Sequence, residues 1–338
     1  MSGVAIEIEQ LYAEEVHLPL EEPRAIAWGT DTHADVIRVE VRGAGCFGRG
    51  EAQPMGHYGD SILLALSQLE DVREALLRGT SREGLSTLLP PGGARNALDA
   101  ALWDLEAAQT GRDAVEIAGV GMPHSIVTAY TIPIKSPAEV AEVAEREQER
   151  PLIKVKLGHY DDDRARLEAI RRAAPDADLI VDANEGWTFP QLAEMGAVMH
   201  DLGVKLVEQP LRAGDDAVLL GFDCGVPLCA DESCHTPASL DMLQGRYAYI
   251  NIKLDKSGGL TEALTLAREA RNRGFGLMVG CTSGTTLSIA PAFLLAQFCT
   301  FCDLDAPLFL ASREEEELVY DGSRLNWSPS RRWGTAAR

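Results

Sequence analysis

The sequence predicts an α/β protein in which a closed barrel of eight parallel strands with helical connections follows a smaller α+β layer. Two observations predict this fold. Five apolar segments in the middle of the chain each end in a charged residue, with steps of 26, 26, 23 and 22 residues between the charges. Such a step is about one strand plus one helix and its loops. In addition, strand-like and helical segments alternate from about residue 125 to residue 310.

The first part of the chain predicts the α+β layer. Two antiparallel strands and two helices are expected there, at residues 6–17, 34–41, 61–78 and 94–109. The second helix has apolar residues at i, i+3, i+4 and i+7, and a glycine follows its end: Leu98, Ala101, Leu102, Leu105 and Gly111. The glycine-rich stretches 28–33 and 51–59 are expected to be loops that form a lid over a site elsewhere.

The barrel elements follow this layer. Strands are expected near residues 125–134, 153–158, 178–184, 204–209, 227–232, 247–254, 276–282 and 300–305. Helices are expected between them, at residues 136–149, 162–174, 190–202 and 261–273. The alternation then stops, and residues 319–327 predict a short hairpin that returns to the first layer. The expected organisation is an N-terminal layer with lid loops, a catalytic barrel and a C-terminal segment, at residues 1–120, 121–311 and 312–338.

Composition excludes several classes of partner. The 338 residues carry a formal net charge of −21, which argues against nucleic acid or an anionic membrane surface as partner. The apolar runs are too short to span a bilayer, and the N-terminus has no signal-peptide profile. Seven cysteines, an odd number, fit a reducing compartment. We therefore expect a cytoplasmic enzyme with a small-molecule substrate, and a homo-oligomer is compatible with the sequence.

Three acidic residues end successive barrel strands. Asp182, Glu208 and Asp231 each follow an apolar segment, where an unpaired charge is costly to bury. Active sites of such barrels collect at the C-terminal ends of the strands, so the three carboxylates can converge there. Hard oxygen ligands suit Mg²⁺ or Mn²⁺. The alternative is that each carboxylate makes its own salt bridge or helix cap.

Lysines lie on either side of this acidic set. Lys156 ends the second strand and Lys253 ends the sixth, so they are expected to face each other across the barrel mouth. Two lysines on opposite sides of one carbon can remove a proton from one face and return it to the other, as in a racemase or epimerase. Lys154 shares the face of Lys156, and its charge disfavours the ammonium form of that neighbour.

These motifs together resemble the enolase superfamily, in its muconate-lactonizing subgroup. The resemblance covers nearly the whole chain and rests on Lys154-x-Lys156, Asp182-x-Asn184, Glu208-Gln209-Pro210, Asp231-Glu232-Ser233 and Asn251-Ile252-Lys253. It implies a (β/α)7β-type modified TIM barrel with an α+β capping domain, and a metal-stabilised enediolate formed by a lysine base. The branch that uses a His–Asp pair on later strands is disfavoured, because no histidine follows His235.

The eighth strand narrows the resemblance. Asp303-Leu304-Asp305 is similar to the Asp-x-Asp signature of dipeptide epimerases, which implies that both acids hold the free α-ammonium of a dipeptide. An ordinary acidic loop is the alternative. Residues 229–236 and 251–264 resemble the L-Ala-D/L-Glu epimerases of murein peptide metabolism.

One departure from that family concerns the side-chain pocket. Glutamate-accepting members place an arginine in the first capping loop, where this chain has Asp31, with Arg24 upstream. The seventh-strand segment around Thr282 is small and polar. An acid at this position repels a glutamate side chain and favours a basic or polar one. The substrate is therefore expected to be Ala-Glu or a cationic dipeptide.

Other assignments stay open. Within the same subgroup, an o-succinylbenzoate synthase, an N-acylamino acid racemase or a cycloisomerase would use the same metal and lysines. A binding protein that keeps the barrel as a scaffold is the alternative from another class. His235 is expected to be a structural residue and not a base. For Lys256 a surface position is expected, with a place beside Asp255 at the barrel mouth as the alternative.

Overall fold

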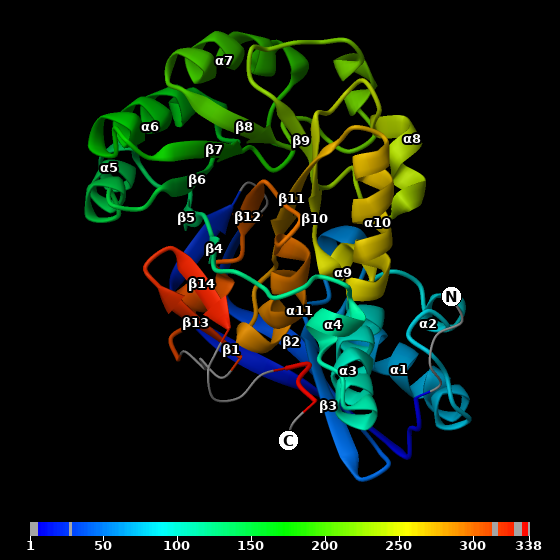
Figure 1. The fold of residues 1–338 in the computed structure, drawn as a ribbon. Helices are drawn as coiled ribbons and strands as arrows, with labels where there is room; N and C mark the ends of the chain where they lie inside the picture. The colour runs from blue at the N-terminus through cyan, green and yellow to red at the C-terminus, as the bar shows by residue number, and fades with distance from the viewer. Residues whose placement is uncertain (1–5, 27–28, 313–316, 328–332, 337–338) are drawn as a thin grey trace.

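The structure, a computed structural model, describes residues 6–26, 29–312, 317–327 and 333–336. It has two parts, an antiparallel capping layer and a parallel barrel (Figure 1). The capping layer is the sheet of β1 (Gln10–Ile26), β2 (Gly29–Gly43) and β3 (Cys46–Ala52), with α1 (Ile62–Leu77), α2 (Leu85–Leu88) and α3 (Gly93–Thr110). The two predicted strands and two predicted helices are confirmed.

Alternating apolar residues of the capping sheet pack against the helices. Ile37, Val39 and Val41 of β2 form one core with Leu98 and Leu102 of α3. β3 approaches α3 so closely that added Cβ atoms at its glycines would lie 2.0 Å from helix carbonyl oxygens, at Gly48 and Gly50. Glycine therefore sets the distance between sheet and helix.

The barrel contains the eight predicted parallel strands. In chain and spatial order they are β5 (Tyr130–Ile132), β6 (Leu152–Lys156), β7 (Asp178–Asp182), β8 (Val204–Glu208), β9 (Leu228–Ala230), β10 (Tyr249–Ile252), β11 (Gly276–Gly280) and β12 (Phe301–Asp303). The backbone N–H of Ala129 donates to the carbonyl of Cys302 at 2.8 Å, which brings the two edges of the sheet together. One apolar cluster fills the interior below the mouth: Ala129, Leu152, Ile180, Leu206, Cys229 and Met278.

Helices cover the outside of the barrel. The longer ones are α5 (Pro137–Arg146), α6 (Tyr160–Ala173), α7 (Phe189–Asp201), α10 (Leu260–Asn272) and α11 (Thr286–Ala296). Local sequence explains their starts, as at α5, where Ser136 and Glu139 form a capping box around Pro137. Shorter helices are α4 (Ala114–Ile117), α8 (Leu240–Leu243) and α9 (Leu254–Ser257). The connection between β8 and β9 contains the 3₁₀ turn η2 (Asp216–Leu219).

Two expectations about the ends of the elements were wrong. Residues 29–33 do not form a loop, because β1 and β2 continue as one long hairpin; Trp28 lies outside the described residues. The C-terminal hairpin of β13 (Leu318–Asp321) and β14 (Arg324–Trp327) forms, but it pairs with β4 (Ile126–Val127) instead of the capping sheet. The contact of the C-terminal segment with the capping layer is made on either side of the hairpin, by Glu317 with Arg49 and by Trp333 with Ala100. No helix in the described part of the chain has the length and apolarity needed to cross a bilayer.

Candidate active site

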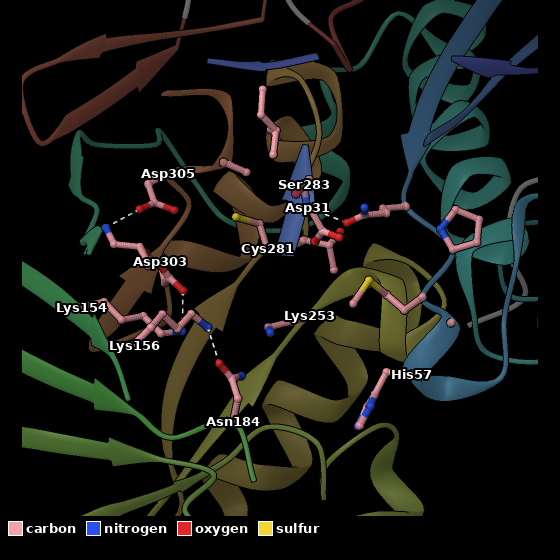
Figure 2. A pocket seen from close by; sticks show the side chains of 18 residues that line it. Asp31, His57, Lys154, Lys156, Asn184, Lys253, Cys281, Ser283, Asp303 and Asp305 are labelled. Carbon is pink, nitrogen blue, oxygen red and sulfur yellow. Dashed lines mark hydrogen bonds and ion pairs between the residues drawn. The ribbon is translucent and has the colours of Figure 1, made fainter. Parts of the chain in front are cut away.

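A cavity of about 320 Å³ lies at the C-terminal ends of the barrel strands. Leu20 and Asp31 of the β1–β2 hairpin and the stretch from Gln53 to His57 line it from the capping side. All of the residues predicted to be catalytic or substrate-binding line it: Asp31, Lys154, Lys156, Lys253, Thr282, Asp303 and Asp305 (Figure 2). The sequence motifs thus meet in one place, although they come from distant segments.

Strand alternation explains why the lysines of β6 reach this cavity. Ile153 and Val155 belong to the core under the helices, so Lys154 and Lys156 point to the barrel interior. Lys154 is 1% exposed, and its Nζ lies 2.7–2.9 Å from one carboxylate oxygen each of Asp182, Glu208 and Asp303. Burial lowers the pKa of Lys154, but these charges together raise it well above its ordinary value.

Lys156 and Lys253 approach the cavity from different strands and point toward each other (Figure 2). Lys156 Nζ donates to Asp182 Oδ2 at 2.7 Å and to Asn184 Oδ1 at 2.9 Å. Lys253 Nζ donates to Asp231 Oδ2 at 2.7 Å. Three strands, β7 to β9, separate their positions in the sheet. The cavity therefore has one amine on each side.

The three acids predicted to bind a metal end β7 and β8 and follow β9. Asp182, Glu208 and Asp231 are fully buried. Burial and the charge of Asp182 raise the pKa of Glu208 to about 7. Burial also raises the pKa of Asp182, but Lys154 and Lys156 outweigh it and bring it to about 2. The oxygens of the three acids do not all lie within 4.8 Å of one another, and each carboxylate contacts a lysine ammonium group.

Unsatisfied oxygens indicate that this region suits a cation. Three buried oxygens of described residues in this region accept no hydrogen bond: Glu208 Oε2, Glu232 Oε2 and Asn251 Oδ1. Of these, Glu208 Oε2 forms an ion pair with Lys154 Nζ at 2.7 Å. Glu232 directly follows Asp231, and Asn251 Nδ2 donates to Glu208 Oε1 at 2.7 Å. Buried acceptors without donors are costly, and carboxylate and amide oxygens are ligands for Mg²⁺ or Mn²⁺. The donor set therefore fits a hard divalent cation.

The acid pair of the eighth strand lies beside the lysines. Thr131 donates to both acids, from its backbone N–H to Asp305 Oδ2 at 2.6 Å and from its hydroxyl to Asp303 Oδ1 at 3.3 Å. Asp303 Oδ2 also accepts from Lys154 at 2.7 Å. Both carboxylates line the cavity and are at most 5% exposed as residues. The pair forms a negatively charged wall that can accept a cationic group.

The side-chain wall consists of residues from both layers. Asp31 is exposed near the start of β2, and its backbone pairs with that of Arg24 in β1. The side chain of Arg24 lies outside the described part of the structure. Thr282 follows β11, and its hydroxyl donates to Asp255 Oδ2 at 2.8 Å.

The expectation that Lys256 is a surface residue was wrong. Lys256 is 3% exposed, and its Nζ donates to the backbone carbonyl and to Oδ1 of Asp231, and to the carbonyl of Asn251 at 3.1 Å. Asp231 therefore lies between two ammonium groups, those of Lys253 and Lys256. Burial raises the pKa of Asp231, but these two charges hold it well below its ordinary value. Only the close spacing of Lys253 and Lys256 in the sequence could have suggested this contact.

His57 is a second residue that the sequence did not single out. It lines the cavity from the capping side, and its Nε2 lies 2.9 Å from Glu185 Oε2 in the loop after β7. The backbone of Asn184 and Glu185 has positive φ values of 41° and 66°, which non-glycine residues rarely adopt. Such strain is common at functional sites, and here it directs Asn184 toward Lys156.

Comparison with known proteins identifies the family. Residues 8–119 match the N-terminal domain of mandelate racemase and muconate lactonizing enzyme, and residues 138–326 match the enolase C-terminal domain-like family. The chain is 44% identical to the L-Ala-D/L-Glu epimerase of Escherichia coli over 91% of this chain and 96% of the relative. It is 42% identical to the N-acetyl-D-glutamate racemase of a Pseudoalteromonas species over 89% of this chain and 96% of the relative.

Solved structures agree with this relationship. An enolase family member from Agrobacterium tumefaciens with homology to dipeptide epimerases, solved with sodium and L-Ala-L-Glu, superimposes with a TM-score of 0.93 at 43% identity. The match covers 96% of this chain and 99% of that one. A dipeptide epimerase from Methylococcus capsulatus, complexed with Mg and L-Arg-D-Lys, gives 0.88 at 31% identity, with 97% and 99% covered. This chain therefore belongs to the mandelate racemase and muconate lactonizing enzyme family of the enolase superfamily, in its dipeptide epimerase branch.

Proposed function

We propose that the enzyme is a dipeptide epimerase that moves a proton from one face of the α-carbon of the C-terminal residue to the other. The observation that carries this proposal is the pair of amines, Lys156 and Lys253, that point toward each other across one cavity. A single base could exchange the proton, whereas inversion needs a donor on the opposite face. Relatives named L-Ala-D/L-Glu epimerase support the reaction class.

The metal would be held by Asp182, Glu208 and Asp231. When bound, Mg²⁺ polarises the substrate carboxylate and stabilises the negative charge that develops on its oxygens, and Mn²⁺ is a chemical substitute. The unsatisfied oxygens near these acids support the assignment, as do related structures solved with Mg and a dipeptide.

The lysines divide the proton transfer between them. Lys156 accepts the α-proton from one face and Lys253 donates a proton to the other, and their roles exchange when the reaction runs backward. Lys154 keeps its charge because three carboxylates surround it. This charge lies on the same strand face as Lys156, beside the amine that is proposed to act as the base.

The acid wall selects the N-terminal group of the substrate. Asp303 and Asp305 would bind the free α-ammonium of the dipeptide, which can replace Lys154 as a partner of Asp303. Asp31 and Thr282 would contact a substrate side chain. We propose Ala-Glu as the first substrate to test, and a cationic dipeptide as the second because Asp31 is acidic. Related structures contain L-Ala-L-Glu in one case and L-Arg-D-Lys in another.

We assign substrate binding and proton transfer to three parts of the chain. Residues 1–120 act as the capping domain, residues 121–311 carry the chemistry, and residues 312–338 return toward the capping layer.

The location we propose is the cytoplasm. All seven cysteines are free, which supports a reducing compartment.

A dipeptide library incubated with Mg²⁺ in ²H₂O tests the reaction and the substrate together. Each epimerised dipeptide gains one mass unit at the α-carbon, and chiral chromatography then identifies the new diastereomer. Exchange without inversion would exclude the two-lysine mechanism. No exchange in any dipeptide would exclude the proposed function.

A second candidate function is racemisation of an N-acylamino acid. The 42% identical N-acetyl-D-glutamate racemase favours it, because an N-acetyl group carries no positive charge. The substitution Asp303→Asn separates the two functions. It should lower kcat/KM for a dipeptide about tenfold or more, since a charge-assisted hydrogen bond is lost. It should have little effect on turnover of an N-acetylated substrate.

A further inference from the structure

One carboxylate, that of Asp255, connects the capping loop to the barrel. Asp255 lies in α9, two residues after Lys253, and its side chain contacts the capping layer. Its Oδ1 accepts from the backbone N–H of Gln53 and from Asn96 Nδ2, both at 3.0 Å. Its Oδ2 accepts from the hydroxyl of Thr282 at 2.8 Å. Within the described residues, no lysine, arginine or histidine forms an ion pair with it.

These contacts are part of a closed ring around the edge of the cavity. The backbone N–H of Ser283 donates to Gln53 Oε1 at 2.8 Å, so Gln53 contacts both Asp255 and the segment after β11. Gln53, Thr282 and Ser283 all line the cavity. Asp255 does not line it. It therefore holds residues from both layers that face the cavity and has no contact with the cavity itself.

We propose that Asp255 is a positioning residue for substrate recognition. It fixes Gln53 and Thr282 in one arrangement, so that this side of the cavity already has the shape that the substrate side chain requires before the substrate binds. Because Gln53 and Thr282 are already fixed, they lose less entropy when the substrate binds, so the main effect of Asp255 is on substrate binding. This inference rests on the proposed function, because the wall matters for KM only if the cavity takes a dipeptide.

The chemistry required of Asp255 is hydrogen-bond acceptance and needs no charge. Its three partners are neutral donors, and burial of the carboxylate raises the pKa of Asp255 above its ordinary value. An asparagine keeps Oδ1 as acceptor for Gln53 and Asn96. Its amide can donate to the hydroxyl of Thr282, which can rotate to accept. The neutral amide should therefore replace the acid, whereas alanine should not.

The experiment compares Asp255→Ala with Asp255→Asn in the Mg²⁺-loaded full-length enzyme. Alanine should raise KM for the preferred dipeptide about tenfold while kcat changes less than about threefold, because binding is lost more than chemistry. Asparagine should keep KM within about threefold of the wild type. Hydrogen–deuterium exchange of residues 51–58 should be faster in the alanine variant and normal in the asparagine variant.

Glu106→Gln is the matched control. Glu106 is a buried carboxylate of the same interface, paired with Arg82 at 2.6 Å, and within the described residues it forms no hydrogen bond or ion pair with a cavity-lining side chain. This variant should lower the melting temperature but leave KM unchanged. If it raises KM as much as Asp255→Ala does, general loosening of the interface explains the effect and the inference is wrong.

Other outcomes are equally decisive. An unchanged KM together with unchanged exchange in Asp255→Ala would overturn the inference. If that variant does not fold, Thr282→Val removes one donor of the ring and should raise KM about threefold. If the wild type epimerises no dipeptide, the proposed function fails, while the exchange of residues 51–58 still shows whether Asp255 orders the wall.

Discussion

The barrel mouth and the interface between α3 and the barrel both contain buried charges, but they differ in how these charges are satisfied. In the interface, Arg82 pairs with Glu106 at 2.6 Å and also stacks on Trp103, and Asp99 accepts from the backbone and the hydroxyl of Thr261. One guanidinium nitrogen there, Arg95 Nε, has no hydrogen-bond partner.

The mouth contains the opposite kind of unsatisfied atom. Among the described residues, Glu232 Oε2 and Asn251 Oδ1 are acceptors without a hydrogen-bond donor, and Glu208 Oε2 has an ion pair with Lys154 at 2.7 Å but no hydrogen bond. These atoms lie among four buried carboxylates, those of Asp182, Glu208, Asp231 and Glu232. An unsatisfied donor such as Arg95 Nε cannot bind a cation, whereas unsatisfied acceptor oxygens can, so the open capacity of the mouth suits a positively charged ligand. The contrast indicates which buried acids take part in binding before any ligand is considered.

The largest expected effect comes from the lysines of the mouth. Lys156→Ala and Lys253→Ala should each lower the rate of epimerisation at least about 10³-fold, because each removes a proton-transfer group. Mg²⁺ affinity, measured by calorimetry, should stay largely intact. Lys205→Ala, at a half-exposed site paired with Asp178, is the control and should keep full activity. Full activity in either cavity variant would contradict the two-base assignment.

The next prediction concerns the interface, where the raised pKa of Asp99 should make stability depend on pH. Burial raises the pKa of Asp99 to about 6, against 3.8 for an exposed carboxyl, despite the hydrogen bonds from Thr261. Between these pH values the folded protein binds more protons than the unfolded one, so the contribution of Asp99 to stability falls as the pH rises from 4 to 6. The full loss is about 3 kcal/mol.

Asp99→Asn should remove this pH dependence, since an amide does not titrate in this range and its Oδ1 can still accept a hydrogen bond from Thr261. Denaturant unfolding at pH 4, 5, 6 and 7 measures it, and the stability of the variant relative to the wild type should increase with pH. Asp178→Asn, at an exposed carboxylate, is the control. If the free energies of unfolding of the wild type and Asp99→Asn change with pH in the same way, burying the charged carboxylate of Asp99 costs no stability and the prediction is wrong.

Glu208 tests the unsatisfied oxygens of the mouth. Mg²⁺ at 100 times its Kd should raise the free energy of unfolding of the wild type by about 2.7 kcal/mol. In Glu208→Gln most of this increase should disappear, because a neutral amide oxygen attracts a hard divalent cation less than a carboxylate does. Thermal unfolding with and without MgCl₂ measures the increase in both proteins, and an undiminished Mg²⁺ effect would exclude Glu208 as a ligand.

The barrel and the cavity could be predicted because a charge at the end of a buried strand has few explanations. Lys154, Lys156 and Asp182 follow that logic, and the structure brings them within hydrogen-bond distance. The roles assigned to them stay predictions, which the variants above test.

The direction of side chains in turns could not be predicted. Asp255 and Lys256 are adjacent in the sequence, yet the first contacts the capping layer and the second contacts Asp231. Both residues lie in the one-turn helix α9, where successive side chains point about 100° apart around the axis, so the two face different neighbours. The extension of the β1–β2 hairpin was missed for another reason: Gly29 and the polar residues after it suggested a loop, whereas pairing with β1 makes residues 29–33 part of a strand.

The last described segment has a consequence for how the protein can be divided. Trp333 is 1% exposed, and its indole N–H lies within hydrogen-bond distance of the carbonyls of Ala100 and Arg49, both in the capping layer. Its backbone N–H donates to Glu317, which also pairs with Arg49. The polypeptide thus leaves the capping layer, completes the barrel and then inserts the Trp333 ring into the capping layer. A fragment that stops near residue 120 would leave an open slot between α3 and β3, so the capping layer should be produced only as part of the whole polypeptide.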